Sequence, residues 1–155
     1  MPPEPGSLLV AGAVVGVVGV LDDAGRATTQ WFKGSGHRIA LLGPDAVSLG
    51  GSEYLWAVHR TLAGRLAPLD LALERRVQAA VVAAIEAGLV LSAHDCAEGG
   101  LAVALAECCL TGPEPVGATV AVPGAGRSDL VLFGEGPSRV VVSVPGARSL
   151  EFEAL

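Results

Sequence analysis

The chain has little charge and no excess of basic residues. Only 17% of its 155 residues are charged while 51% are hydrophobic, which excludes a chain that is disordered throughout. Acidic residues outnumber Lys and Arg by 16 to 10, so we expect no general nucleic-acid partner. A local phosphate site is still compatible with the net charge of −6, because backbone N–H groups can hold an anion.

Cysteine is scarce, and its spacing fits neither a disulfide framework nor a zinc site. The chain has three cysteines, Cys96, Cys108 and Cys109, and the odd number argues against a disulfide-stapled secreted domain. No CxxC pair or His/Cys cluster is present, so we predict no structural zinc. Cys108 and Cys109 lie in an apolar helical context, which is typical of small core residues.

The sequence also lacks a long hydrophobic run and a basic leader. Its longest uncharged apolar run, residues 8–21, has 14 residues, fewer than the ~20 that a membrane-spanning helix needs. The residues before that run carry no positive charge, unlike the start of a signal peptide. We therefore expect a cytoplasmic protein with no membrane partner.

Hydrophobic patterns predict alternating strands and helices. Short valine- and leucine-rich runs predict strands at residues 14–21, 37–42, 89–92, 118–122 and 139–144. Apolar residues at helical spacing predict a long helix with Pro68 in its first turn and Gly88 just after its end. Shorter helices are predicted at residues 53–60, 101–110 and 149–155. This order predicts an α/β or α+β fold.

A first glycine pair precedes a predicted helix. Gly50 and Gly51 would let the backbone approach a ligand, and the helix that follows Ser52 would attract an anion at its N-terminus. The simpler interpretation is a plain turn in which Ser52 caps the helix, since Ser is a preferred N-cap residue.

A second glycine pair follows two polar residues at a strand end. His94 and Asp95 end a predicted strand, and Gly99 and Gly100 open the next helix. Ligands often bind at such carboxyl ends of strands, and a carboxylate suits Mg²⁺. His94 is a candidate base, although a structural histidine is the more common case.

A third cluster surrounds a Gly-Pro turn before the last predicted strand. Glu135 and Arg139 flank this turn, and a surface ion pair between them is the simplest interpretation. The sequence contains no Walker A motif, no GxGxxG loop opening a helix and no GxSxG elbow, so none of these familiar sites explains the glycines.

Taken in order, the three clusters resemble one enzyme family. The matching segments are Leu49–Leu55, Ser92–Glu107 and Leu132–Val144, and Val15–Leu21 adds a fourth. They are similar to the synthetase region of phosphoribosylformylglycinamidine synthase, within the aminoimidazole ribonucleotide synthetase-like superfamily. The family joins formylglycinamide ribonucleotide to glutamine-derived ammonia, with ATP activating the formamide oxygen.

The resemblance implies a domain organisation and an expected fragment. The family has two copies of an N-type domain and a C-type domain. Residues 1–33 would be the tail of the second N-type domain, ending in its last strand, and residues 34–155 a truncated second C-type domain. The family's catalytic His and its Gly-Asn-x-Ser nucleotide segment have no counterpart here, so the resemblance assigns no catalytic residue.

The resemblance does imply an auxiliary site for ATP or ADP with Mg²⁺. Asp95 matches the metal-binding Asp of the family's His-Asp-x-Ser-x-Gly-Gly motif, and Ala97 replaces its Ser. Losing that hydroxyl removes a hydrogen bond worth about 1 kcal/mol. The nucleotide-binding positions implied by the matching segments are Gly50, Gly51, Ser52, His94, Ala97, Gly99, Gly100, Glu135 and Ser138.

The implied partners are the rest of the synthetase, the glutaminase and the small accessory subunits of the complex. A related ATP-using enzyme, such as a selenophosphate or thiamine-phosphate kinase, is an alternative. The segment Gly-Gly-Ser-Glu-Tyr-Leu fits the purine enzyme better. A third alternative is a non-catalytic module that docks a partner through an unpaired strand edge.

Overall fold

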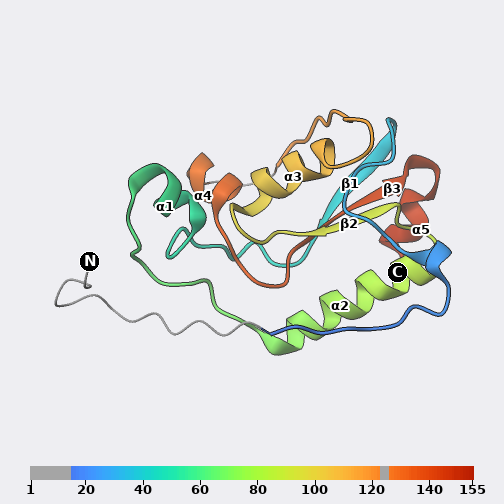
Figure 1. Ribbon diagram of the computed structural model, residues 1–155, viewed down its shortest axis with the longest axis horizontal. Helices are drawn as coiled ribbons and strands as arrows, with labels where there is room; N and C mark the ends of the chain where they lie inside the picture. The colour runs from blue at the N-terminus through green and yellow to red at the C-terminus, as the bar shows by residue number, and fades with distance from the viewer. Residues whose placement is uncertain (1–14, 123–125) are drawn as a thin grey trace.

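The computed structural model describes residues 15–122 and 126–155, and at its centre is a three-stranded antiparallel sheet (Figure 1). Its strands are β1 (His37–Leu42), β2 (Ser92–Asp95) and β3 (Val140–Pro145), in the order β1-β3-β2. The strands predicted at residues 37–42 and 139–144 are thus confirmed. The fold combines helices with an antiparallel sheet, as the α+β alternative expects.

The register of the sheet gathers three chain segments at one end. Leu42 of β1 and Asp95 of β2 both lie opposite Val140, the first residue of β3. Because β3 is antiparallel to both neighbours, β1 and β2 end where β3 begins. The residues that follow β1 and β2 therefore meet those that precede β3.

The side chains of β3 alternate between two cores on opposite faces of the sheet. Val141 packs with α3 (Gly100–Leu110), whereas Val142 and Val144 pack with α2 (Leu71–Glu86). Figure 1 shows these two helices on opposite sides of the sheet. Successive side chains of a strand point to opposite faces of the sheet, so β3 contributes side chains to both cores.

The remaining helices are short. They are α1 (Glu53–His59), α4 (Ser128–Phe133), α5 (Ser149–Glu153) and the 3₁₀ turns η1 (Ala24–Arg26) and η2 (Gly146–Arg148). α4 contacts α3, while Phe152 of α5 packs on the core of the α2 face. Helix α4 was not predicted, because its six residues are too few for a helical period to show.

Residues at the two ends of α2 determine where this helix begins and ends. Asp70 caps its start by accepting hydrogen bonds from Ala72 N and Leu73 N, at 2.9 and 3.1 Å. Pro68 therefore lies before the helix, not in its first turn as predicted. Gly88 follows the last turn with φ +64°, the left-handed conformation for which it was predicted.

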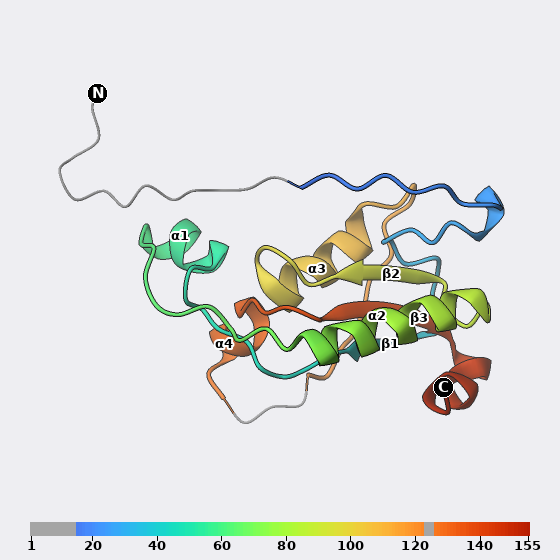
Figure 2. The same ribbon diagram turned by 90° about the horizontal axis from the view of Figure 1, so that it is seen from below.

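The strand predicted at residues 14–21 is not formed where the structure describes it. Val14 lies outside the described residues, and residues 15–21 are irregular, with Val18 97% exposed. Figure 2 shows this blue segment as an extended run outside the sheet. Valine favours a strand only when a neighbouring strand pairs with it, and no described residue does so here. The chain joins the body later, where Thr29 bridges to Ser92 and Phe32 enters the α3-side core.

Two other strand predictions need correction. Residues 118–122 are irregular, because the described structure gives them no ladder partner. The strand predicted at 89–92 begins only at Ser92, since Leu89 N still donates to Ala84 O at the end of α2. The helices predicted at 53–60, 101–110 and 149–155 are confirmed with small shifts at their ends. Every helix in the two described stretches is too short or too polar to span a bilayer.

Candidate functional site

One carboxylate joins the three glycine clusters. Glu135 Oε1 accepts hydrogen bonds from Glu53 N at the start of α1 and from Gly99 N before α3, both at 2.8 Å. The backbone of Glu135 also exchanges two hydrogen bonds of 2.9 Å with Ser48. Glu135 therefore holds two helix N-termini together, and a negative charge is favourable at that position.

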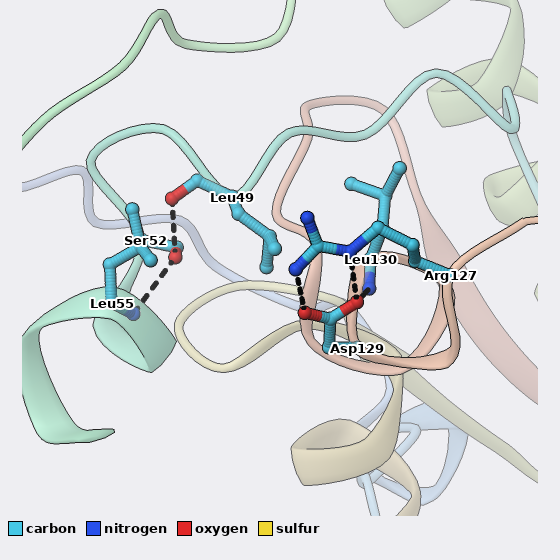
Figure 3. A network of polar contacts seen from close by, with 6 residues as sticks. All are labelled: Leu49, Ser52, Leu55, Arg127, Asp129 and Leu130. Carbon is cyan, nitrogen blue, oxygen red and sulfur yellow. Dashed lines mark hydrogen bonds and ion pairs between the residues drawn. The ribbon is translucent and has the colours of Figure 1, made fainter. Parts of the chain in front are cut away.

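The first cluster is a helix cap in this structure. Ser52 is fully buried, and its hydroxyl donates to Leu49 O at 2.7 Å and accepts from Leu55 N at 3.3 Å (Figure 3). Gly50 N donates to Ser48 Oγ and Gly51 N to Ala63 O, each at 2.9 Å. The N–H groups expected to meet a phosphate are already engaged, which favours the N-cap interpretation over a ligand role.

The glycines allow backbone segments to touch. A Cβ on Gly50 would lie 2.2 Å from Arg65 O, and one on Gly100 would lie 2.6 Å from Gly134 O. Gly100 also has φ +67°, which disfavours any side chain. Its N–H donates to Ala97 O at 3.2 Å. These glycines pack protein against protein where the sequence suggested an open phosphate cradle.

His94 and Asp95 differ in their surroundings. His94 Nε2 lies 2.8 Å from Glu107 Oε2, and its Nδ1 lies 3.4 Å from Asp95 Oδ1. The His94 side chain is 12% exposed and is hydrogen-bonded through Nε2, as a structural histidine is. The Asp95 side chain is 75% exposed, so its carboxylate is accessible to a ligand.

The surroundings of Asp95 suit a metal ion that binds together with a nucleotide better than they suit a metal ion held by the protein alone. Among the described residues, no group of three or more His, Cys, Asp or Glu side chains is arranged to hold a metal ion. Mg²⁺ commonly takes one or two protein carboxylates and completes its shell with phosphates and water. A single accessible carboxylate meets that requirement. The neighbouring Ala97 is also exposed, but its methyl group offers no hydrogen bond.

Ser138 is committed to the fold. It has φ +62°, and its hydroxyl donates to the Glu74 carboxylate on α2. Its carbonyl oxygen lies where a Cβ on Gly43 would be, only 1.9 Å away. Ser138 thus anchors the start of β3 to α2 and to the end of β1.

An ion pair that the sequence analysis missed lies at the first turn of α4. Arg127 contacts the Asp129 carboxylate at 2.5 Å, and Asp129 Oδ1 accepts from Leu130 N at 2.9 Å (Figure 3). The hydrogen bond from Arg127 lowers the pKa of Asp129 below its ordinary value. Arg127 is largely exposed, so we expect this pair to contribute little stability.

The predicted surface ion pair between Glu135 and Arg139 is wrong. Glu135 faces the helix N-termini, while Arg139 is only 6% exposed. Its Nε and Nη1 atoms are buried and have no hydrogen-bond partner within residues 15–122 and 126–155. The sequence around Arg139, a Gly-Pro turn typical of a surface, did not indicate that this side chain would point inward.

The fold and its residues match a known family. Residues 34–155 match the family described as AIR synthase related protein, C-terminal domain. The chain belongs to this family. The matched residues include the three strands of the sheet and the helices α2 and α3 on its two faces.

Two curated relatives of this AIR synthase C-terminal domain share one name. "Phosphoribosylformylglycinamidine synthase subunit PurL" of Synechococcus sp. (strain JA-2-3B'a(2-13)) is 52% identical over 143 residues, covering 91% of this chain and 18% of the relative. The protein of the same name from Anaeromyxobacter sp. (strain Fw109-5) is 48% identical over 149 residues, covering 91% and 19%. The chain thus spans about a fifth of the length of these relatives.

Solved structures share the fold at low sequence identity. Thermotoga maritima PurL complexed with FGAR has a TM-score of 0.61 and 19% identity, covering 83% of this chain and 23% of that one. The same protein complexed with ATP has a TM-score of 0.59 and 17% identity, covering 84% and 21%. At this identity the likeness concerns the fold.

Proposed function

We propose that the chain supplies the second C-type domain of a phosphoribosylformylglycinamidine synthase. The observation that carries the proposal is the 52% identity with a synthase subunit across 91% of the chain. The reaction converts formylglycinamide ribonucleotide, ATP and glutamine-derived ammonia into formylglycinamidine ribonucleotide. The T. maritima structures with FGAR and ATP are in line with these substrates. The division into residues 1–33, from an N-type domain, and residues 34–155 is part of the proposal.

Within that enzyme we assign this chain two roles: it is part of the scaffold, and it carries an auxiliary nucleotide site. Asp95 would hold Mg²⁺, which neutralises phosphate charge when bound with ATP or ADP. His94, held between Asp95 and Glu107, would keep the end of β2 in place. Of the residues named from the sequence, we retain Asp95 and Ala97 as the ligand-facing set, with His94 as a positioning residue behind Asp95. Gly50, Gly51, Ser52, Gly99, Gly100, Glu135 and Ser138 are engaged within the protein and would support that set.

The proposed partners follow from the same assignment. They are the rest of the synthetase, the glutaminase and the small accessory subunits, in the cytoplasm. A solved complex described as PurLQS from T. maritima, with a TM-score of 0.54, supports partner subunits in general. No nucleic acid or membrane belongs to this proposal.

A thermal melt with and without Mg·ADP tests the auxiliary site. Ligand at ~100 times its Kd adds about 2.7 kcal/mol to the free energy of unfolding. For a chain of this size that corresponds to a rise in Tm of about 5–10 °C. Asp95→Asn removes the charge that would hold Mg²⁺, and Asp22→Asn, at an exposed irregular position, is the matched control.

The expected result is a rise in Tm for the unchanged chain and for Asp22→Asn, and no rise for Asp95→Asn. Equal melts with and without Mg·ADP in all three proteins would refute the auxiliary site. A separate experiment tests the assignment that this chain contains no catalytic residue. The purified chain given formylglycinamide ribonucleotide, ATP and ammonia should form no product, and turnover would refute that assignment.

A further inference from the structure

A pocket of about 560 Å³ lies between the sheet and the layer formed by α3 and α4. Its walls are mostly apolar and come from β1, α3, α4, the segment that follows β1 and the segment that precedes α4; they include Ile39, Leu41, Leu101, Leu105 and Leu130. Small-molecule sites usually have volumes of about 300–1,000 Å³, apolar walls and few polar groups. The pocket has the size and surface of a ligand site.

Arg139 supplies a buried charged group in this pocket. It lines the pocket and is 6% exposed, and its Nε and Nη1 atoms find no partner among the described residues. Arg139 immediately precedes β3 and is two residues from Val141, which faces α3. The alternation along the extended chain therefore directs both residues to the α3 side.

A buried guanidinium without a partner calls for a counter-charge. Arginine remains charged under all ordinary conditions, and a buried charge is unfavourable unless it is paired and hydrogen-bonded. Asp45 lines the same pocket, but it is an exposed residue and accepts no hydrogen bond from Nε or Nη1 of Arg139. Glu135, the nearest acidic residue in the sequence, uses Oε1 for the N-termini of α1 and α3. Its carboxylate is thus committed elsewhere.

We propose that this pocket binds a small carboxylic acid with an apolar body. The planar fork of Arg139 matches a carboxylate, which can accept two parallel hydrogen bonds. The apolar body would lie against Ile39, Leu41 and Leu101. Asp45 also lines the pocket, and its negative charge disfavours a ligand with several negative charges, such as a nucleoside triphosphate. Asp95 does not line this pocket, and the proposal does not depend on the nucleotide proposal.

Hexanoate is a suitable probe, because it joins one carboxylate to a short alkyl chain. We would titrate it into the full chain and follow the Nε–H resonance of Arg139 and the amides of Leu101 and Leu105 by NMR. Hexan-1-ol has the same apolar body without the charge, and inorganic phosphate has the charge without the body. We expect hexanoate to bind at least tenfold more tightly than either.

Two variants with the same change of charge separate the pocket from general electrostatics. Arg139→Met keeps a long side chain but removes the guanidinium, and it should weaken hexanoate binding at least tenfold, to the level of hexan-1-ol. Arg38→Met, at an exposed position of β1, should leave binding unchanged. Removing an unpaired buried charge should not lower Tm. Arg139→Lys, which keeps the charge and loses the fork, should bind hexanoate more weakly than the unchanged chain.

Three results would overturn the proposal. The first is equal affinity of the unchanged chain for hexanoate and hexan-1-ol, a comparison that requires no variant. The second is unchanged hexanoate affinity in Arg139→Met. The third is phosphate binding as tight as hexanoate binding, which would leave no role for the apolar walls. A nucleotide effect at Asp95, present or absent, changes none of these results.

Discussion

Replacing Glu135 should loosen two helices at once. Its Oε1 accepts hydrogen bonds from Glu53 N and Gly99 N, which lie 82 and 36 residues away in the sequence. Glu135→Gln keeps an acceptor oxygen but loses the negative charge at two helix N-termini. Glu135→Ala loses the acceptor as well. The two variants therefore separate the charge from the hydrogen bonds.

The magnitudes follow from those two contacts. A negative charge near a helix N-terminus contributes about 0.3–1 kcal/mol, so for two helices Glu135→Gln should lower the free energy of unfolding by about 0.6–2 kcal/mol. Removing a capping side chain costs about 0.5–2 kcal/mol per helix end. With two ends exposed in Glu135→Ala, we expect a loss of about 1–4 kcal/mol.

Urea unfolding of the full chain measures these losses, and hydrogen exchange locates them. The amides of Glu53 and Gly99 should exchange faster together in both variants, because they share one acceptor. Glu114→Gln, at an exposed position between α3 and α4, makes the same change of charge and is the control. It should change neither the urea midpoint nor the exchange of these two amides.

The reasoning would be refuted by either of two results. One is a loss below about 0.5 kcal/mol in Glu135→Ala, the size expected of an ordinary surface substitution. The other is faster exchange at only one of the two amides, which would mean that the carboxylate does not hold both helices.

Three further predictions concern other positions. Gly100→Ala should lower the free energy of unfolding in urea by about 2 kcal/mol or more, since φ is +67° and the new Cβ would meet Gly134 O at 2.6 Å. The control Gly117→Ala, with open space around the new Cβ, should change it by no more than about 0.5 kcal/mol. Equal losses in the two variants would contradict this prediction. Burial raises the pKa of Cys108 to about 11 from its ordinary value of 9.0, so the neutral thiol stabilises the folded state below pH 9 and this stability is lost as the pH rises through 11. Between pH 9 and 11, Cys108→Ala should therefore lose less free energy of unfolding than the unchanged chain. Parallel losses in the two proteins would argue against this reasoning. Ala97→Ser restores a hydroxyl worth about 1 kcal/mol and should tighten Mg·ADP binding about fivefold by calorimetry, while unchanged affinity would place residue 97 away from the nucleotide.

Local patterns predicted most of the helices and two of the strands. The apolar repeat and the break at Gly88 located α2, and Ser52 was recognised as a possible cap because its hydroxyl acts on the turn that it begins. Residues 15–21 show the limit of such patterns. Their valines have strand propensity, but a strand forms only with a neighbour to pair with, and propensity carries no information about that neighbour.

The candidate site shows the same division. Its glycine clusters were visible in the sequence, yet their convergence on Glu135 was not, since each contact joins residues far apart in the chain. The role of the glycines also differs from the expectation: a glycine needed for close backbone packing looks in sequence like one that would cradle a phosphate. Only the contacts distinguish the two.

The amino-acid sequence by itself indicated where most of the helices and two of the strands lie, that α2 ends before Gly88, and which residues could carry chemistry. These properties depend on neighbours within a few positions, through capping, turn geometry and hydrophobic period. The tertiary structure alone decided the strand order, the shared cap at Glu135, the exposure of Asp95 and the burial of Arg139. Burial and charge pairing depend on the surroundings that distant segments create, so the same arginine beside a Gly-Pro turn could lie in water or inside a pocket.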